Sequence, residues 1–149
     1  MKSFREFDVW KLAMELTDRV YDIVKTFPTE ERYALGDQLR RAVVSIPSNI
    51  AEGFGRDSHK DFAHFLAQAR GSLYEVDTQL EIASRRGYCK PDPVIVDLMN
   101  SISKLLASLS RHLRDTAAQS TRHKAQGAGD AVVPAQGTRH KAQGTCIPG

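Results

Sequence analysis

At 149 residues the chain is long enough for one compact core and too short for two ordinary domains. Its formal charge of +3 belongs to one end, because residues 1–115 hold 17 basic and 17 acidic side chains and residues 116–149 hold 4 and 1. A balanced folded part gives no support for a basic surface over the whole domain. Two cysteines, Cys89 and Cys146, exclude a disulfide framework and a four-cysteine metal site. The first residues include acidic side chains and no apolar run, so we expect a cytoplasmic protein without a signal peptide or membrane span.

The first predicted helix runs from about Asp8, as N-cap, to Lys25 or Thr26. Its apolar side chains cover more than half of its circumference, which is wider than one bundle seam requires. Such a helix is either seated deeply in its own bundle or part of a subunit interface with aromatic anchors, and we expect the interface. The second apolar face consists of Trp10, Met14, Thr17 and Tyr21.

A second helix is predicted from Thr29 to about Gly53. Pro47 lacks a backbone donor and crowds the preceding turn, so we expect a kink or a restart there. Gly53 or Gly55 is expected to take the left-handed conformation that closes many helices. A polar stripe runs beside the apolar face, and polar groups in that position need partners. Its members are Gln38, Arg41, Ser45, Asn49 and Glu52.

The third predicted helix runs from Ser58, as N-cap, to about Arg86, with apolar residues at alternating spacings of three and four. It carries a polar stripe of its own, which an antiparallel neighbour would bring against the first. We expect Arg41 and Glu75 to form an ion pair inside the bundle. The second stripe consists of Gln68, Ser72, Glu75 and Gln79.

Gly71 lies in the interior of this third helix, where glycine costs about 1 kcal/mol relative to alanine. We therefore expect another helix or another chain to approach closely at Gly71. Ile82 lies on the same outer side of the helix, away from the apolar stripe, and supports a second contact surface. The candidate oligomer interface thus comprises Trp10, Met14, Tyr21, Gly71 and Ile82.

Asp92 and Pro93 begin a fourth predicted helix, which ends near Asp115. Short connections favour antiparallel neighbours, so the four helices predict an all-α, up-down-up-down four-helix bundle over residues 4–115.

Residues 116–149 contain no Leu, Phe, Tyr or Trp, and the segment Thr-Arg-His-Lys-Ala-Gln-Gly occurs twice, at 121–127 and 138–144. Because so little apolar surface is available to offset the entropy of ordering, we expect a disordered, low-complexity tail.

Catalytic and metal-binding patterns are not recognisable in the sequence. The nearest approach to a di-metal bundle motif is Asp61 with His64, which occurs once and lies off the apolar face. We expect no catalytic residue, no metal site and no cofactor. The candidate nucleic-acid contacts, whose charge nearby carboxylates largely balance, are Arg40, Arg56, Lys60 and Arg70, with Lys104, Arg111 and Arg114 as a later group.

The run Arg-Arg-Ala-Val-Val-Ser-Ile-Pro-Ser-Asn-Ile-Ala-Glu-Gly at 40–53, followed by Gly55-Arg56, resembles the signature of the four-helix-bundle family of 23S rRNA intervening-sequence proteins. Phe27-Pro28 and Gly71-Ser72 fit the same pattern, and the resemblance covers about residues 4–115. It assigns the signature polar stripe to Arg41, Ser45, Asn49, Glu52, Ser72 and Glu75.

The resemblance implies a non-catalytic scaffold or adaptor that forms a ring of five subunits. A related accessory protein of diversity-generating retroelements binds RNA and a reverse transcriptase through a basic surface. The alternative function is therefore an RNA- or DNA-binding accessory protein that acts with a nucleic-acid enzyme.

Overall fold

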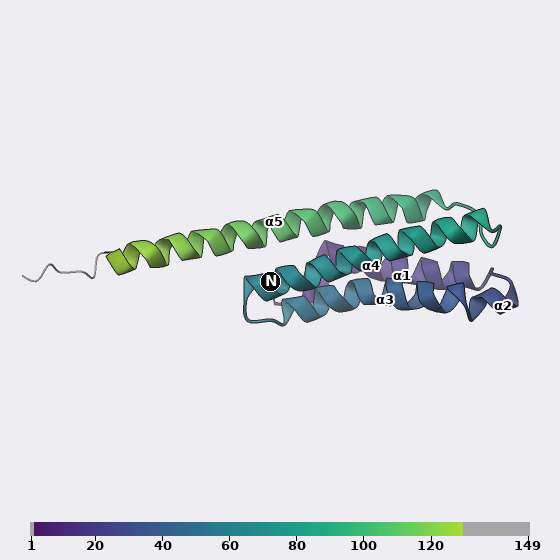
Figure 1. Ribbon diagram of the computed structural model, residues 1–149, viewed down its shortest axis with the longest axis horizontal. Coiled ribbons are helices and arrows are strands. Elements are labelled where there is room, and N and C mark those ends of the chain that lie inside the picture. The colour runs from purple at the N-terminus through teal and green to yellow at the C-terminus, as the bar shows by residue number, and fades with distance from the viewer. Residues whose placement is uncertain (1, 130–149) are drawn as a thin grey trace, which may run out of the picture.

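The structure, a computed structural model, describes residues 2–129 and is entirely helical in its regular elements over that range. Four long helices confirm the predicted all-α four-helix fold (Figure 1). One turn of 3-10 helix precedes them, and a short helical turn lies in the first connection. The elements are η1 (Phe4–Glu6), α1 (Asp8–Val24), α2 (Thr29–Arg32), α3 (Leu35–Phe54), α4 (His59–Arg85) and α5 (Pro93–Gly129).

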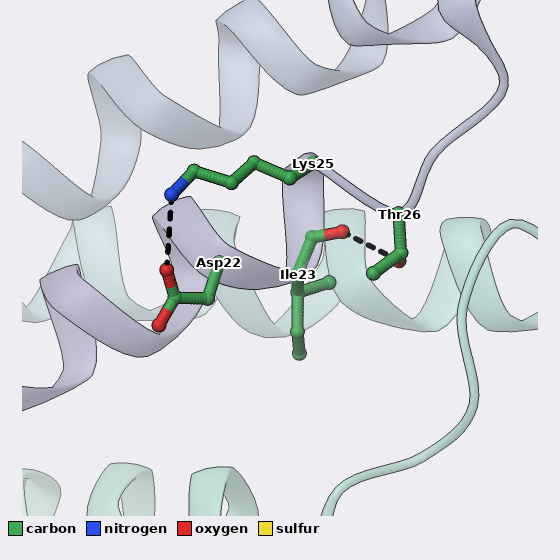
Figure 2. A network of polar contacts seen from close by, with 4 residues as sticks. All are labelled: Asp22, Ile23, Lys25 and Thr26. Atoms are coloured by element: carbon green, nitrogen blue, oxygen red, sulfur yellow. Dashed lines mark hydrogen bonds and ion pairs between the residues drawn. The ribbon is translucent and has the colours of Figure 1, made fainter.

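Polar side chains bond to the last turn of α1, as Figure 2 shows. The Thr26 hydroxyl donates to the Ile23 carbonyl over 2.7 Å, and the Lys25 ammonium lies 3.4 Å from the Asp22 carboxylate. The same carbonyl also accepts from the Thr26 backbone N–H over 2.9 Å, so the hydroxyl is a second donor to it at the end of the helix. The exposed ion pair adds little stability.

The predicted second helix is divided in two, so the expectation of one helix from Thr29 is wrong. Ala34, between α2 and α3, has φ −108° and ψ −95°, outside the helical region. Packing explains the division: a Cβ atom added at Gly36 would lie 2.7 Å from Val24 Cγ1. Because Gly36 has no side chain, the start of α3 lies close to the end of α1. A larger residue at this position would push the two helices apart.

Aromatic contacts give the directions of the helices. The ring of Phe7, which precedes α1, lies 5.5 Å from Phe54 at the end of α3 and 6.1 Å from Phe62 in the first turn of α4. Phe27 and Tyr88, which follow α1 and α4, lie 5.8 Å apart. Thus α1 and α4 run in one direction and α3 in the other. The chain reverses again after Tyr88, so α5 runs back along α1 and α4 (Figure 1).

The core lies between the apolar faces of these four helices, and each helix contacts the two helices beside it. Burial follows the spacings of three and four expected of amphipathic helices. The side chains with almost no exposure include Leu16 and Val20 of α1, Leu39, Ile46 and Ile50 of α3, Leu66 and Val76 of α4, and Ile102 and Leu106 of α5.

The expected restart at Pro47 does not occur, because α3 continues without interruption from Leu35 to Phe54. Proline at this position leaves the carbonyl of Val43 without its usual helical donor. The Thr17 hydroxyl of α1 lies 3.5 Å from that carbonyl, although its shorter bond, 2.8 Å, is to Ala13 of its own helix. The Thr17 side chain of α1 therefore places a polar group near the carbonyl that Pro47 leaves without a donor.

Helix α5 is longer than predicted and projects beyond the bundle (Figure 1). Its 37 residues span about 55 Å, whereas the 27 residues of α4 span about 40 Å. The predicted disorder from Thr116 onward is therefore wrong for residues 116–129, which are helical; the rest of the predicted tail lies outside the described residues. The first copy of the repeated segment, 121–127, falls within this projecting part of α5.

Candidate oligomer interface and polar seam

The two predicted polar stripes meet at the middle of the contact between α3 and α4. The hydroxyl oxygens of Ser45 and Ser72 lie 2.8 Å apart. The Asn49 amide donates to both the carbonyl and the hydroxyl of Ser45, each over 2.8 Å. All three side chains are half-buried, and we call Ser45, Asn49 and Ser72 the polar seam. The small serines permit close packing, and the hydrogen bonds satisfy their polar groups.

The prediction that Arg41 and Glu75 form an ion pair inside the bundle is wrong. Both residues are exposed, and within residues 2–129 no ion pair joins them. Burial of an ion pair in a dry interior carries a desolvation penalty that exposure avoids. The charged ends of the two stripes therefore face outward, and only the neutral members meet between the helices.

Glu52 and Gly53 shape the end of α3. The Arg56 guanidinium lies 2.9 Å from the Glu52 carboxylate and 4.6 Å above the Phe65 ring, which holds the connection against α4. A Cβ atom at Gly53 would lie 2.7 Å from Phe62 Cδ2 and 2.8 Å from Phe65 Cβ. The glycine is thus required by close packing. The expected left-handed cap is absent at Gly55, the C-cap residue, whose φ is −78°.

The four candidate nucleic-acid contacts fall into two pairs. Arg40 forms an ion pair with Asp37 and donates to the Arg32 carbonyl over 2.8 Å, and Arg56 is engaged as described above. Lys60 and Arg70 are exposed and form no ion pair within the described range. Only this second pair is available to a ligand without breaking an internal contact.

The predicted interface residues of α1 form a partly exposed apolar surface. Met14 and Tyr21 are 39% and 41% exposed, and half-buried Trp10 packs edge-to-face on Phe4 with ring centroids 5.4 Å apart. Helical spacing places all three on the side of α1 that borders α3. We call Trp10, Met14 and Tyr21 the outer α1 surface.

Gly71 and Ile82 lie on the outer side of α4. Nothing lies within 4 Å of a Cβ atom added at Gly71, so the expected approach by another helix of the same chain is absent. Ile82 is 45% exposed, and Thr78, between the two, is exposed as well. We call Gly71, Thr78 and Ile82 the outer α4 surface. It is a different side of the bundle from the outer α1 surface.

Val44 was missed as a candidate surface residue because it stands within the apolar run of the signature. It is 40% exposed, whereas its neighbours Val43 and Ile46 are fully buried. The helical period could have predicted this exposure. Val44 is rotated by about 100° from the buried Val43, which turns its side chain away from the core.

Within the described residues, no group of three or more His, Cys, Asp or Glu side chains is close enough together to hold a metal ion. None of the helices described combines the length and apolar character needed to cross a bilayer. Cys89 is half-buried beside the start of α5, and burial raises the pKa of its thiol.

Together, the fold and the polar seam define a small four-helix bundle in which hydrogen bonds between side chains join α3 and α4. The chain belongs to the family of 23S rRNA-intervening sequence proteins, whose model matches residues 5–111.

A crystal structure of a protein of unknown function from the S23 ribosomal protein family of Bacteroides thetaiotaomicron VPI-5482 is similar to this chain. The two are 26% identical, the match covers 69% of this chain and 95% of the other, and the TM-score is 0.64. No curated protein matches the chain. The projecting part of α5 lies beyond the residues matched by the family model.

Proposed function

We propose that the protein is a non-catalytic scaffold that assembles with copies of itself, head to tail, into a closed ring. The observation that carries this proposal is the outer α1 surface, where three large apolar side chains are left partly uncovered by a bundle whose own core is complete. Apolar side chains grouped in this way are typical of subunit contacts, whereas single exposed ones are common on monomers.

The head-to-tail arrangement follows from the positions of the two surfaces. The outer α1 surface and the outer α4 surface lie on different sides of the bundle, so contact between them joins two unlike patches. Repetition of such a contact gives a ring when the rotation between copies closes. Gly71 suits the contact, because a residue without a side chain allows the aromatic groups of another copy to approach the α4 backbone.

The ring is expected to contain five subunits, as the family resemblance implies. Its solution mass, measured by light scattering on the full chain over a range of concentrations, should approach about five times 16.6 kDa. Met14→Glu with Tyr21→Glu should give monomers, and so should Ile82→Glu alone. Tyr33→Glu is the matched control, because Tyr33 is 74% exposed and lies on neither surface.

Mixing the two monomeric variants tests the head-to-tail contact directly. The Met14→Glu, Tyr21→Glu variant keeps an intact α4 surface, and the Ile82→Glu variant keeps an intact α1 surface. The mixture should form one-to-one dimers that grow no further, because each dimer has lost both outer contacts. A wild-type monomer at high concentration would refute self-assembly, and variants that stay monomeric when mixed would refute the head-to-tail contact.

The alternative function, an RNA- or DNA-binding accessory protein acting with an enzyme such as a reverse transcriptase, requires an available basic surface. Lys60 and Arg70 support it on the bundle, whereas Arg40 and Arg56 are engaged internally. A gel-shift titration across salt would test it, since phosphate contacts make affinity fall steeply with salt concentration.

A further inference from the structure

The part of α5 from Leu98 onward carries a basic surface, and its members from Arg114 onward lie beyond the residues that the family model matches. Between Leu98 and Gly129 the only acidic residue is Asp115, and every basic residue is exposed. None of these basic side chains forms an ion pair with any residue from 2 to 129. The basic residues of this part of the helix are Lys104, Arg111, Arg114, Arg122 and Lys124.

Helical geometry arranges two of these side chains in a row. Arg111 and Arg122 are eleven residues apart, which is about three turns and about 16 Å, so both point to the same side of α5. Asp115 is one turn from Arg111 and reduces the charge there. Lys104 lies apart from this row, in the groove between α1 and α5 that Asp8 and Lys11 also line.

Arg114 continues the basic surface onto the bundle. It lines a cavity of about 70 Å³ between α4 and α5 together with Arg70. Both arginines are exposed, and no carboxylate lines the cavity; its other lining residues are Ala63, Leu66, Ala67, Leu106 and Ser110. A polyanion that follows the projecting helix therefore meets a second pair of positive charges where the helix joins the bundle.

The composition of this helix identifies the kind of polyanion. Residues 114–129 contain no apolar side chain larger than alanine, so they offer neither the apolar face of a membrane-surface helix nor the anchors of a helix that docks in a protein groove. The whole of α5 lacks Phe, Tyr and Trp, on which unpaired bases stack. The features that remain are regular helical form and positive charge.

We propose that the end of α5 from Arg111 onward, with Arg70 beside it, binds the phosphate backbone of duplex DNA without sequence preference. A bare helix of about 10 to 12 Å diameter fits the major groove of B-form DNA, about 12 Å wide, whereas the major groove of duplex RNA is too narrow for side chains to read. This binding is independent of the proposed ring, although several copies on one assembly would strengthen it.

The test is fluorescence anisotropy of the full chain with a labelled random-sequence DNA duplex over a salt series. Five phosphate contacts, by Arg70, Arg111, Arg114, Arg122 and Lys124, predict a slope of log affinity against log salt of about −4.5. Arg111→Ala with Arg122→Ala should reduce the slope to about −2.7 and weaken binding in 50 mM salt by at least about tenfold.

The matched control is Arg19→Ala with Arg85→Ala, which removes two arginines that form ion pairs on α1 and α4 and should leave the slope unchanged. No duplex binding by the wild type in 50 mM salt would overturn the proposal. So would an equal loss in both double variants, or tighter binding to single-stranded RNA, duplex RNA or anionic lipid vesicles than to the DNA. Light scattering on the same samples keeps this result separate from the ring, because neither double variant alters the outer α1 or α4 surface.

Discussion

Replacement of Gly53 by alanine tests whether the close contact between α3 and α4 is a requirement of the fold. The new Cβ atom would lie 2.7 Å and 2.8 Å from atoms of Phe62 and Phe65, which is closer than carbon atoms can approach. Phe62 is buried in a cluster of rings that includes Phe7 and Phe54, so it cannot move without disturbing its neighbours. Overpacking of this kind costs about 1 to 3 kcal/mol.

The gain in helix propensity acts in the opposite direction. Glycine to alanine contributes about 1 kcal/mol of stability in a helix interior and less near a helix end, so Gly53→Ala should lower the free energy of unfolding by a net 0 to about 3 kcal/mol. Gly71→Ala is the control, because it lies in a helix interior, nothing lies within 4 Å of its new Cβ atom, and only the gain applies. The two variants should therefore differ by about 1 to 4 kcal/mol.

Urea unfolding, followed by helical circular dichroism at a concentration where the protein is monomeric, measures both values. Low concentration matters, because in the proposed ring the extra methyl group at Gly71 would also weaken the subunit contact. Equal stabilisation of the two variants would refute the reasoning, since it would mean that α4 moves away from α3 without loss.

Three further predictions concern single side chains. Ser45→Ala should lower the free energy of unfolding by about 0.5 to 1.5 kcal/mol, because it removes the hydroxyl that bonds to both Ser72 and Asn49; an unchanged urea midpoint would contradict this. Arg41→Ala should change the free energy of unfolding by less than about 0.5 kcal/mol, as expected of an exposed side chain without an ion pair. A larger loss would support the buried ion pair with Glu75 after all. Burial raises the pKa of Cys89, so its alkylation by iodoacetamide at pH 8, measured by mass spectrometry in a Cys146→Ser background, should be slower than in the urea-unfolded chain. Because the folded pKa is the higher one, the stability that the neutral thiol contributes is complete below the unfolded pKa and is lost as pH rises through the folded pKa; equal alkylation rates would refute the shift.

The periodicity of the sequence was sufficient to predict the four helices and most of the core, because burial in a helical bundle repeats with the helix turn. The meeting of Ser45 with Ser72 also followed from two stripes on antiparallel neighbours. The roles of Gly36 and Gly53 did not, since each depends on which residue of another helix happens to face it.

Two of the failed predictions, the Arg41–Glu75 ion pair and the disorder after Thr116, failed for reasons that chain order alone does not reveal. Arg41 and Glu75 were paired by helix phase, but their exposure is set by how far α3 and α4 separate at the surface. The continuation of α5 was missed because lack of apolar surface was taken to exclude a helix. Residues 117–126 contain several Ala, Gln, Arg and Lys, which favour helix, and the bundle supplies the preformed turns that make extension easier than nucleation.

The proline in α3 favours one position of α1 along the length of α3. If α1 slid along α3 by one turn, about 5.4 Å, apolar residues would again meet apolar residues, and the loss of buried area would be small. The Val43 carbonyl, however, would then lose the neighbouring Thr17 hydroxyl, which lies 3.5 Å from it in the native alignment. The Val43 carbonyl, which lacks its usual amide donor, thus favours the native alignment of α1 and α3 over a shifted one that apolar contacts alone would tolerate.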